Sequence, residues 1–250
     1  MTNFDLLPTQ LAANLQQVRQ RMQAACQRTG RAADAVRLVA VTKTAPVEWI
    51  REFISIAGAS PSQPVDCGEN RPQQLASRAK ELPPTIHWHL IGHLQRNKVD
   101  LAVAHAGMVH SVDSERLLQA LNAEAGKAGR RLPILLEVNV SGEAQKHGFA
   151  PAEVEARFEH LVQQPHLDLQ GLMTMAPLAD DPELARPTFR GLRELRDRLV
   201  ARGLPGITLP HLSMGMSGDF ETAIEEGATL IRVGSALWEN LPPAPSSRIA

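Results

Sequence analysis

The chain lacks tyrosine altogether, has only two cysteines among its 250 residues, and has no long apolar run. Cys26 and Cys67 are too few for a disulfide framework and lack the spacing of metal ligands, which indicates a reduced, cytoplasmic protein. No stretch approaches the roughly 20 apolar residues that span a bilayer. The N-terminus also lacks the basic start and apolar centre of a secretion signal, so neither a membrane protein nor a secreted one is expected.

An excess of charge of either sign is missing as well. The 26 Lys and Arg residues balance 27 Asp and Glu residues to a net charge of −1, so no field draws in nucleic acid or an acidic membrane. The chain does have a hydrophobic share of 43%, which is ample for a large core. No linker divides the sequence into parts. We expect a single domain over residues 1–240 and a disordered tail over 241–250.

Apolar patterning predicts eight short strands, each followed by a helix or a helical turn. An additional amphipathic helix precedes them, with apolar residues at helical spacing from Leu11 to Ala25 and an end near Gly30. The expected strands cover 38–43, 65–68, 86–91, 108–111, 133–140, 167–174, a segment ending with 211–213, and 229–233. The expected helices cover 46–57, a segment up to 81, 95–103, 114–127 with Asp113 as its N-cap, 151–163, 182–202 and 217–226.

This alternation of strands and helices is typical of a parallel sheet with right-handed crossovers. Eight such units over about 250 residues favour a single (β/α)8 TIM barrel, an α/β fold, with the extra helix at its N-terminus. The alternative is an open doubly wound sheet, but no Gly-x-Gly-x-x-Gly turn follows any of the strands. In a barrel, the functional site lies at the carboxyl ends of the strands.

Lys43 stands at the end of the first expected strand. Val39, Val41 and Lys43 share one strand face, because side chains alternate along a strand. A lysine that follows two valines into an interior loses water, and a desolvated amine is a nucleophile that forms Schiff bases with aldehydes. The plainer interpretation is a strand-end lysine that reaches out to solvent.

Two loops with glycines and serines follow the seventh and eighth strands, where barrels often bind phosphate. They are Leu212-Ser213-Met214-Gly215-Met216-Ser217-Gly218 and Arg232-Val233-Gly234-Ser235-Ala236. Both lead into helix starts, where free N–H groups favour an anion, although their serines would also serve simply as helix caps. Because two such loops coincide, we predict a phosphate-binding site.

Arg232 alternates with Ile231 and Val233, so it faces the barrel interior if those two face the helices. A buried arginine needs an acceptor, which is either a carboxylate such as Glu137 or an aromatic nitrogen of a ligand. An amine, phosphate-binding loops and an inward arginine together describe a site for pyridoxal 5'-phosphate (PLP).

His87, His89 and His93 suggest a rival metal site, since two histidines at i and i+2 share a strand face. They are expected near the start of the third strand, away from the barrel mouth and without a carboxylate, so we predict no metal. Lys146 follows the fifth strand on the mouth side. We expect it to be solvated, and a secondary PLP site there is left open.

Several motifs resemble those of the pyridoxal phosphate homeostasis proteins. They are Val41-Thr42-Lys43, Gly68-Glu69-Asn70, His89-Leu90-Ile91-Gly92-His93-Leu94-Gln95-Arg96-Asn97-Lys98, Leu212-Ser213-Met214-Gly215-Met216-Ser217 and Arg232-Val233-Gly234-Ser235-Ala236-Leu237. The likeness runs from about residue 37 to 238. Two departures are Cys67, where an aromatic residue is common, and Pro72. That family is similar to the barrel domain of alanine racemase, a fold-type III PLP-binding protein.

The resemblance implies roles for particular residues. Lys43 would carry PLP as a Schiff base, Asn70 would lie beside the cofactor, and Arg232 would meet the pyridine nitrogen. The phosphate would be held by Ser213, Gly234 and Ser235. The implied function is intracellular PLP homeostasis by buffering, delivery or regulation, with apo PLP enzymes or amino acids as further partners. We expect a monomer.

Amino-acid racemisation is the alternative function. An arginine at the ring nitrogen suits racemisation better than transamination, but racemisation needs an acid or base on each face of the substrate carbon. Racemases of the resembling kind use a tyrosine from an additional domain, and this chain has no tyrosine. We therefore expect a carrier and no enzyme, with Lys146 or His211 as candidates for the second face if racemisation occurs. A metal-dependent barrel hydrolase ranks third.

Overall fold

The computed structural model describes residues 6–58, 64–143 and 145–243. Eight parallel strands form a closed barrel in sequence order, with β8 paired to β1. They are β1 Arg37–Val41, β2 Val65–Glu69, β3 Ile86–Leu90, β4 Met108–Val112, β5 Leu132–Glu137, β6 Leu167–Met173, β7 His211–Ser213 and β8 Leu230–Val233. The predicted TIM barrel is confirmed.

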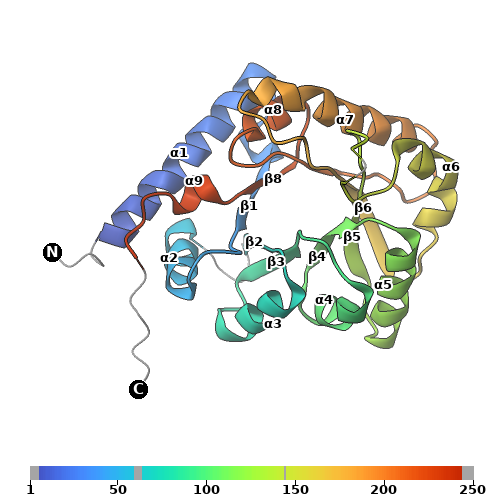
Figure 1. The fold of residues 1–250 in the computed structure, drawn as a ribbon, viewed down its shortest axis with the longest axis horizontal. Helices are drawn as coiled ribbons and strands as arrows, with labels where there is room; N and C mark the ends of the chain where they lie inside the picture. Colours follow the sequence, from blue (N-terminus) through green and yellow to red (C-terminus); the bar gives the residue numbers. More distant parts are fainter. Residues whose placement is uncertain (1–5, 59–63, 144, 244–250) are drawn as a thin grey trace.

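Helices surround the strands (Figure 1). The α-helices are α1 Leu7–Arg28, α2 Val47–Ala57, α3 Pro72–Glu81, α4 Val99–His105, α5 Glu115–Lys127, α6 Pro151–Val162, α7 Arg186–Val200, α8 Phe220–Glu225 and α9 Ser235–Trp238, and short 3-10 turns cover Ala33–Ala35, Arg96–Lys98 and Pro182–Ala185. The predicted N-terminal helix is α1, which packs against α2, α8 and α9. Its Asn14 side chain donates to the carbonyl oxygens of Leu237 (3.0 Å) and Glu239 (2.9 Å).

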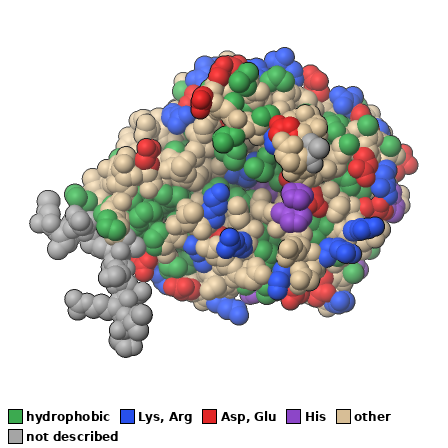
Figure 2. Space-filling model, in the orientation of Figure 1, with side chains coloured by type: hydrophobic (Ala, Val, Ile, Leu, Met, Phe, Trp, Pro, Cys, Tyr) green, Lys and Arg blue, Asp and Glu red, His purple; other side chains and the backbone are tan. Residues whose placement is uncertain are grey.

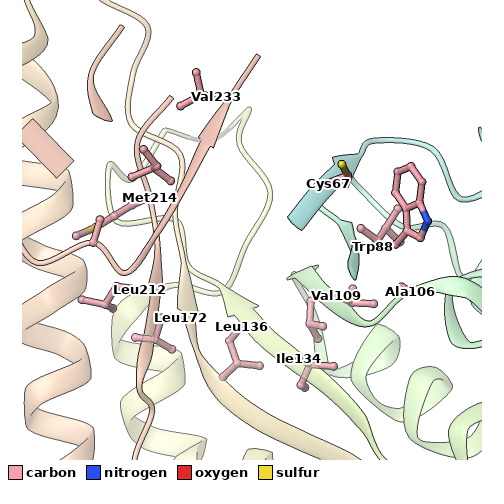
Figure 3. Packing of buried hydrophobic residues seen from close by; sticks show 14 of the residues in the cluster. Cys67, Trp88, Ala106, Val109, Ile134, Leu136, Leu172, Leu212, Met214 and Val233 are labelled. Atoms are coloured by element: carbon pink, nitrogen blue, oxygen red, sulfur yellow. The ribbon is translucent and has the colours of Figure 1, made fainter. Parts of the chain in front are cut away.

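The barrel separates two hydrophobic layers. The larger layer lies between the strands and the helices, and Figure 3 shows part of it, with Leu136 on β5 beside Leu172 on β6 and Leu212 on β7. Cys67 is fully buried in this layer, in register with Trp88. A small second cluster joins alternate strand residues inside the barrel: Val39, Met108, Leu135, Met173 and Leu230. Strand alternation therefore places one face of each strand inside and the other against the helices.

Three predicted element boundaries were wrong for local reasons. The strand predicted over 133–140 ends at Glu137, because the chain returns and the N–H of Phe149 donates to the Glu137 carbonyl oxygen at 2.8 Å. The helix predicted over 182–202 is interrupted before α7, whose second residue is Pro187, which cannot donate within a continuous helix. The N-cap of α5 is Ser114 and not Asp113, since the Ser114 hydroxyl accepts from the N–H of Leu117.

The helix predicted over 95–103 is a 3-10 turn followed by α4, and the helix predicted over 217–226 shortens to α8. Most of the tail predicted over 241–250 lies outside the described residues, which end at 243. Among the helices that the structure describes, none combines the length and the apolar character needed to cross a bilayer.

Candidate PLP-binding site

A cavity of about 580 Å³ opens at the carboxyl ends of the strands. Five of the six predicted site residues line it together: Lys43, Asn70, Arg232, Gly234 and Ser235. On the face shown in Figure 2, histidine side chains and basic side chains gather near the middle of the molecule. A second cleft of about 600 Å³, between α1, α2 and the amino ends of β1 and β2, is lined by neither a lysine nor a glycine. The chemistry predicted from the sequence therefore belongs to the first cavity.

Lys43 lies two residues beyond β1, on a turn. The N–H of Ala45 donates to the carbonyl oxygen of Thr42 at 2.8 Å, which closes the turn across Lys43 and Thr44. Thr42 is fully buried whereas Lys43 is exposed. The expectation that Lys43 continues the interior face of the strand and loses water is therefore wrong, although the side chain does line the cavity.

A buried arginine on α3 holds the backbone on both sides of Lys43. Arg78 donates to the carbonyl oxygens of Thr42 and Ala45, each at 2.6 Å. Glu69 accepts from both Arg78 and the Thr42 hydroxyl. Burial raises the pKa of the Glu69 carboxyl, and its hydrogen bonds with Thr42 and Arg78 oppose this. This arginine–carboxylate pair fixes where the Lys43 turn begins and ends.

Arg232 faces the interior, as predicted from its alternation with Ile231 and Val233. It is only 5% exposed. Its Nη1 donates to Ser213 Oγ at 2.7 Å and its Nη2 donates to the Thr174 carbonyl oxygen at 3.0 Å. Burial lowers the pKa of Arg232 to about 10, a shift that the charges of Asp219 and Glu137 oppose. The guanidinium therefore stays charged near pH 7.

Glu137 ends β5 and lines the same cavity. Burial raises the pKa of its carboxyl to about 7, and the nearby Asp113 adds to this effect, while Arg232 and His93 oppose it. In the described chain Arg232 bonds to Ser213 and Thr174, so the ion pair with Glu137 considered above does not form. Arg232 consequently reaches the cavity without a bound carboxylate.

The segments after β7 and β8 lie against each other on one side of the cavity. Ser217 Oγ accepts from the N–H groups of Gly234 (3.2 Å) and Ala236 (3.4 Å). Trp238 Nε1 donates to the carbonyl oxygen of Val41 at 2.7 Å, which ties this side to the end of β1. Hydroxyls and backbone N–H groups so arranged are the donors that bind a phosphate.

Ser213 does not line the cavity. It is fully buried beneath it, where its hydroxyl is engaged by Arg232 and by His110 Nδ1 at 2.9 Å. This placement does not support a phosphate contact for Ser213, and Ser217, four residues later, lies at the surface of the cavity instead. Sequence reasoning placed Ser217 in the predicted phosphate-binding loop but chose Ser213 as the contact, because strand alternation alone does not say where β7 ends.

Asn70 and Gly92 meet at the ends of β2 and β3. A Cβ on Gly92 would lie 2.5 Å from the carbonyl oxygen of Asn70 and 2.7 Å from its Cα. Only glycine permits this approach, so the Gly92 position sets the location of Asn70 on the cavity wall.

The histidines of β3 do have a carboxylate beside them, which corrects the sequence-based expectation. Asp66 Oδ1 lies 2.9 Å from His87 Nδ1 and 2.8 Å from His89 Nε2. However, Arg37 also donates to Asp66, with Nε to Oδ2 at 2.9 Å, and a guanidinium at that carboxylate opposes binding of a cation. His93 is separate from them. It lies at the cavity rim, 2.9 Å from Asp113 and stacked on His147 with ring centroids 4.2 Å apart.

Neither of the two residues considered for a second catalytic face, Lys146 and His211, lines the cavity. Lys146 is half-buried and only partly solvated, since its Nζ pairs with Glu143 Oε1 at 3.0 Å and donates to the Met175 carbonyl oxygen at 3.4 Å. His211 is the first residue of β7, at the amino end of the barrel and opposite the cavity. Burial and the charge of Arg37 lower its pKa.

The chain is similar to known proteins over most of its length. The family model described as alanine racemase, N-terminal domain, matches residues 9–242. A pyridoxal phosphate homeostasis protein of Aquifex aeolicus is 41% identical over 225 residues, which cover 90% of this chain and 95% of that protein. The human protein of the same name is 36% identical and covers 90% of this chain and 84% of its own length.

Solved structures are similar as well. A protein of unknown function from Bifidobacterium adolescentis has a TM-score of 0.85 at 35% identity and covers 93% of this chain and 96% of its own. PipY from Synechococcus elongatus with PLP bound has a TM-score of 0.77 at 34% identity, covering 91% and 99%. Alanine racemase of Clostridium difficile has a TM-score of 0.72 at 16% identity, covering 96% of this chain and 58% of its own, a likeness of fold alone.

Proposed function

The chain belongs to the alanine racemase N-terminal domain family and, within it, to the pyridoxal phosphate homeostasis proteins, and from this premise we propose that it holds PLP as a Schiff base on Lys43 for intracellular storage and delivery. The observation that carries the proposal is one cavity lined by Lys43, Arg232, Gly234 and Ser235. When bound, PLP supplies an aldehyde that condenses with an amine, and an electron-poor ring.

Each part of PLP has a matching group in the cavity. The exposed amine of Lys43 is accessible to an aldehyde. Arg232 is a buried, charged donor suited to the unprotonated pyridine nitrogen. Ser217 and Ser235 provide hydroxyl donors for the phosphate, and Gly234, whose N–H donates to Ser217 Oγ and so orients that hydroxyl, lies beside them. In this proposal Asn70 lies beside the ring, and the structurally similar PipY, which binds PLP, supports the choice of ligand.

Carriage without turnover is favoured over racemisation by the acid–base groups available. Racemisation requires proton donors or acceptors on both faces of the substrate carbon. The 250 residues include no tyrosine, His211 lies at the amino end of β7, and the Lys146 ammonium group is paired with Glu143. Amino-acid racemase remains the second candidate, because Arg232 at the ring nitrogen suits that chemistry.

The proposal includes a location and partners. The two free cysteines are buried and unpaired, which fits a reducing cytoplasm. PLP is the ligand, apo PLP enzymes are the class of protein that would receive it, and we propose a monomer with a single domain over residues 1–240.

A transfer assay tests the function. Protein loaded with PLP and freed of excess cofactor is mixed with an apo aminotransferase, and recovered aminotransferase activity is followed against an equal amount of free PLP. We expect activity to appear more slowly than with free PLP but to reach the same end point, because the Schiff base must exchange first. No recovery at all, with PLP still bound to Lys43, would exclude a delivery role. The Lys146→Ala variant is the matched control and is expected to behave as the parent.

A further inference from the structure

A chain of buried hydrogen bonds crosses the inside of the barrel beneath the cavity. Asp66 Oδ1 lies 2.8 Å from His89 Nε2, and His89 Nδ1 lies 2.8 Å from His110 Nε2. His110 Nδ1 lies 2.9 Å from Ser213 Oγ, which accepts from Arg232 Nη1 at 2.7 Å. We call Asp66, His89, His110 and Ser213 the histidine chain.

The histidine chain connects strands that are not neighbours. Its residues come from β2, β3, β4 and β7 in order, and Arg232 on β8 completes the path. β4 and β7 are separated by β5 and β6 in the barrel, so the contact between His110 and Ser213 passes through the barrel interior. His89, His110 and Ser213 are all 0% exposed, which means that these groups must satisfy one another without bulk water.

The two ends of the path determine the direction of every hydrogen bond in it. Arg232 can only donate, so the Ser213 oxygen accepts from it, and because His110 is neutral and Nε2 carries its proton, the Ser213 hydroxyl donates to His110 Nδ1. His110 Nε2 donates that proton to His89 Nδ1. His89 in turn carries its proton on Nε2 and donates to the Asp66 carboxylate, which can only accept.

The charge states agree with this direction. Burial lowers the pKa of His89 to about 4, although Asp66 opposes the shift. Burial, with the charges of His89 and Arg232, holds the pKa of His110 well below its usual range. Burial alone would raise the pKa of Asp66, but hydrogen bonds from His87, His89 and Arg37 outweigh it and hold that pKa well below its usual range. Both chain histidines are thus neutral and the carboxylate is ionised near pH 7.

We propose that His110 and Ser213 are positioning residues for Arg232, because they present its Nη1 with a single acceptor of fixed orientation. The inference rests on the proposed PLP function. The carbonyl oxygen of Thr174, which follows β6, accepts from Arg232 Nη2. The guanidinium is therefore fixed at two points, and this sets the direction of its remaining N–H donors. The ring nitrogen of PLP then meets a donor whose position is set before binding.

Packing alone does not call for such a chain. Apolar side chains fill the neighbouring interior positions, among them Val39, Met108 and Leu135. Replacing a buried polar array by apolar residues of similar volume is often neutral or stabilising, because polar groups lose water when they are buried. An oriented acceptor for Arg232, in contrast, can only be supplied by a polar residue.

The tautomers give a test that needs neither a variant nor PLP. Proton–nitrogen NMR of the imidazole groups reports which ring nitrogen carries the proton. We expect His89 and His110 to be neutral with the proton on Nε2, and these protons to exchange slowly with water. A charged ring, or a proton on Nδ1 of either histidine, would overturn the directed chain.

The second test measures what the histidine chain does for the cofactor. Ser213→Ala removes the acceptor of Arg232 and is expected to raise the dissociation constant for PLP about tenfold or more, the size expected for a hydrogen bond to a charged group. The absorbance maximum of bound PLP should also shift. His87→Gln is the matched control, since His87 contacts Asp66 but lies off the path to Arg232. It should stay within about twofold of the parent.

The outcomes are distinguishable. If Ser213→Ala melts at a lower temperature but keeps the parent's dissociation constant and absorbance maximum, the histidine chain is merely structural and the inference is wrong, while the proposed function stands. If the parent protein itself binds no PLP, the proposed function fails and the inference fails with it. Should Ser213→Ala not fold, Ser213→Cys, which keeps the side-chain size and a weaker acceptor, is expected to weaken binding in the same direction.

Discussion

Among the described lysines and arginines, Lys43 and Arg232 line the cavity, and their surroundings differ. Arg232 is buried and held by Ser213 and Thr174, so its position is set before a ligand arrives. Lys43 is exposed, and only its backbone is held, by Gln74 Nε2 donating to its carbonyl oxygen at 3.1 Å. A fixed guanidinium and an exposed amine suit a ligand that is recognised firmly yet released.

Glu137 provides a prediction about pH. Its pKa in the folded protein is about 7, above the ordinary value of 4.5, because burial disfavours the charged form. Its contribution to stability is therefore fully present below pH 4.5 and is lost as pH rises through 7. We expect the free energy of unfolding of Glu137→Gln, relative to the parent, to increase by about 2–3 kcal/mol between pH 5 and pH 8 in the absence of PLP.

Urea unfolding at several pH values measures this difference directly. Glu48→Gln is the control, since Glu48 is exposed on α2 and its replacement should leave the difference nearly constant. A constant difference for Glu137→Gln as well would show that Glu137 ionises in the folded state as easily as in the unfolded one.

Alternation along strands predicted much about individual residues. It correctly placed Arg232 inside the barrel, and it placed Val39 there too. It did not predict that Lys43 leaves the strand, because the turn depends on Arg78, which lies 35 residues later and contacts Thr42 and Ala45. Nor could it reveal the contact between His110 and Ser213, which are 103 residues apart and on strands that are not neighbours.

At the scale of elements, α3 supports the turn that follows β1. Arg78 joins the two, and Glu69 at the end of β2 neutralises it within a nearly water-free space. One oxygen of Glu69, Oε2, has no hydrogen-bond partner among the described residues. The pair therefore depends strongly on both members, because removal of one leaves a buried charge alone.

Arg78→Met is expected to reduce the free energy of unfolding by about 3–5 kcal/mol, since it leaves the Glu69 carboxylate buried without its cation. The double variant Arg78→Met/Glu69→Gln should recover part of this loss because no unpaired charge remains. Urea unfolding of both proteins decides the matter. A double variant that is no more stable than Arg78→Met would show that backbone contacts, and not charge, carry the effect.

Element boundaries were predicted less well than element types. Apolar runs correctly indicated eight strands, but β5 ends three residues before the predicted end, where the Phe149 segment returns to pair with Val138. The break before α7 is marked in the sequence by Pro187, the second residue of α7. Contacts between distant segments and the positions of prolines account for these differences.

At the scale of the whole molecule, Lys43 is the lysine that the barrel presents to a bound amino acid, and the other acid–base groups lining the cavity include Glu137, His93 and His147. Lys146 is paired with Glu143, His211 lies at the amino end of β7, and the chain has no tyrosine for the second face. Loss of a general acid or base typically slows a reaction about 10²–10⁴-fold. We therefore expect PLP-loaded protein to exchange the α-proton of L-alanine in D2O slowly, with retained configuration, and to racemise it far more slowly than an ordinary enzyme.

Chirality and α-deuteration, followed separately, measure the two processes. Racemisation at about 1 per second or faster would be an ordinary enzymatic turnover and would contradict the carrier account. The residues to replace next would then be His93 and His147, which lie at the rim of the same cavity.

The central claim is that Lys43 holds PLP, and reductive trapping tests it most directly. PLP-loaded protein is treated with borohydride, which fixes a Schiff base as a stable amine, and its peptides are then mapped by mass. The account predicts the added mass on the peptide that contains Lys43, its loss in Lys43→Ala although that variant remains folded, and its persistence in Lys146→Ala. An added mass found only on another lysine, or none in a protein that retains PLP, would contradict it.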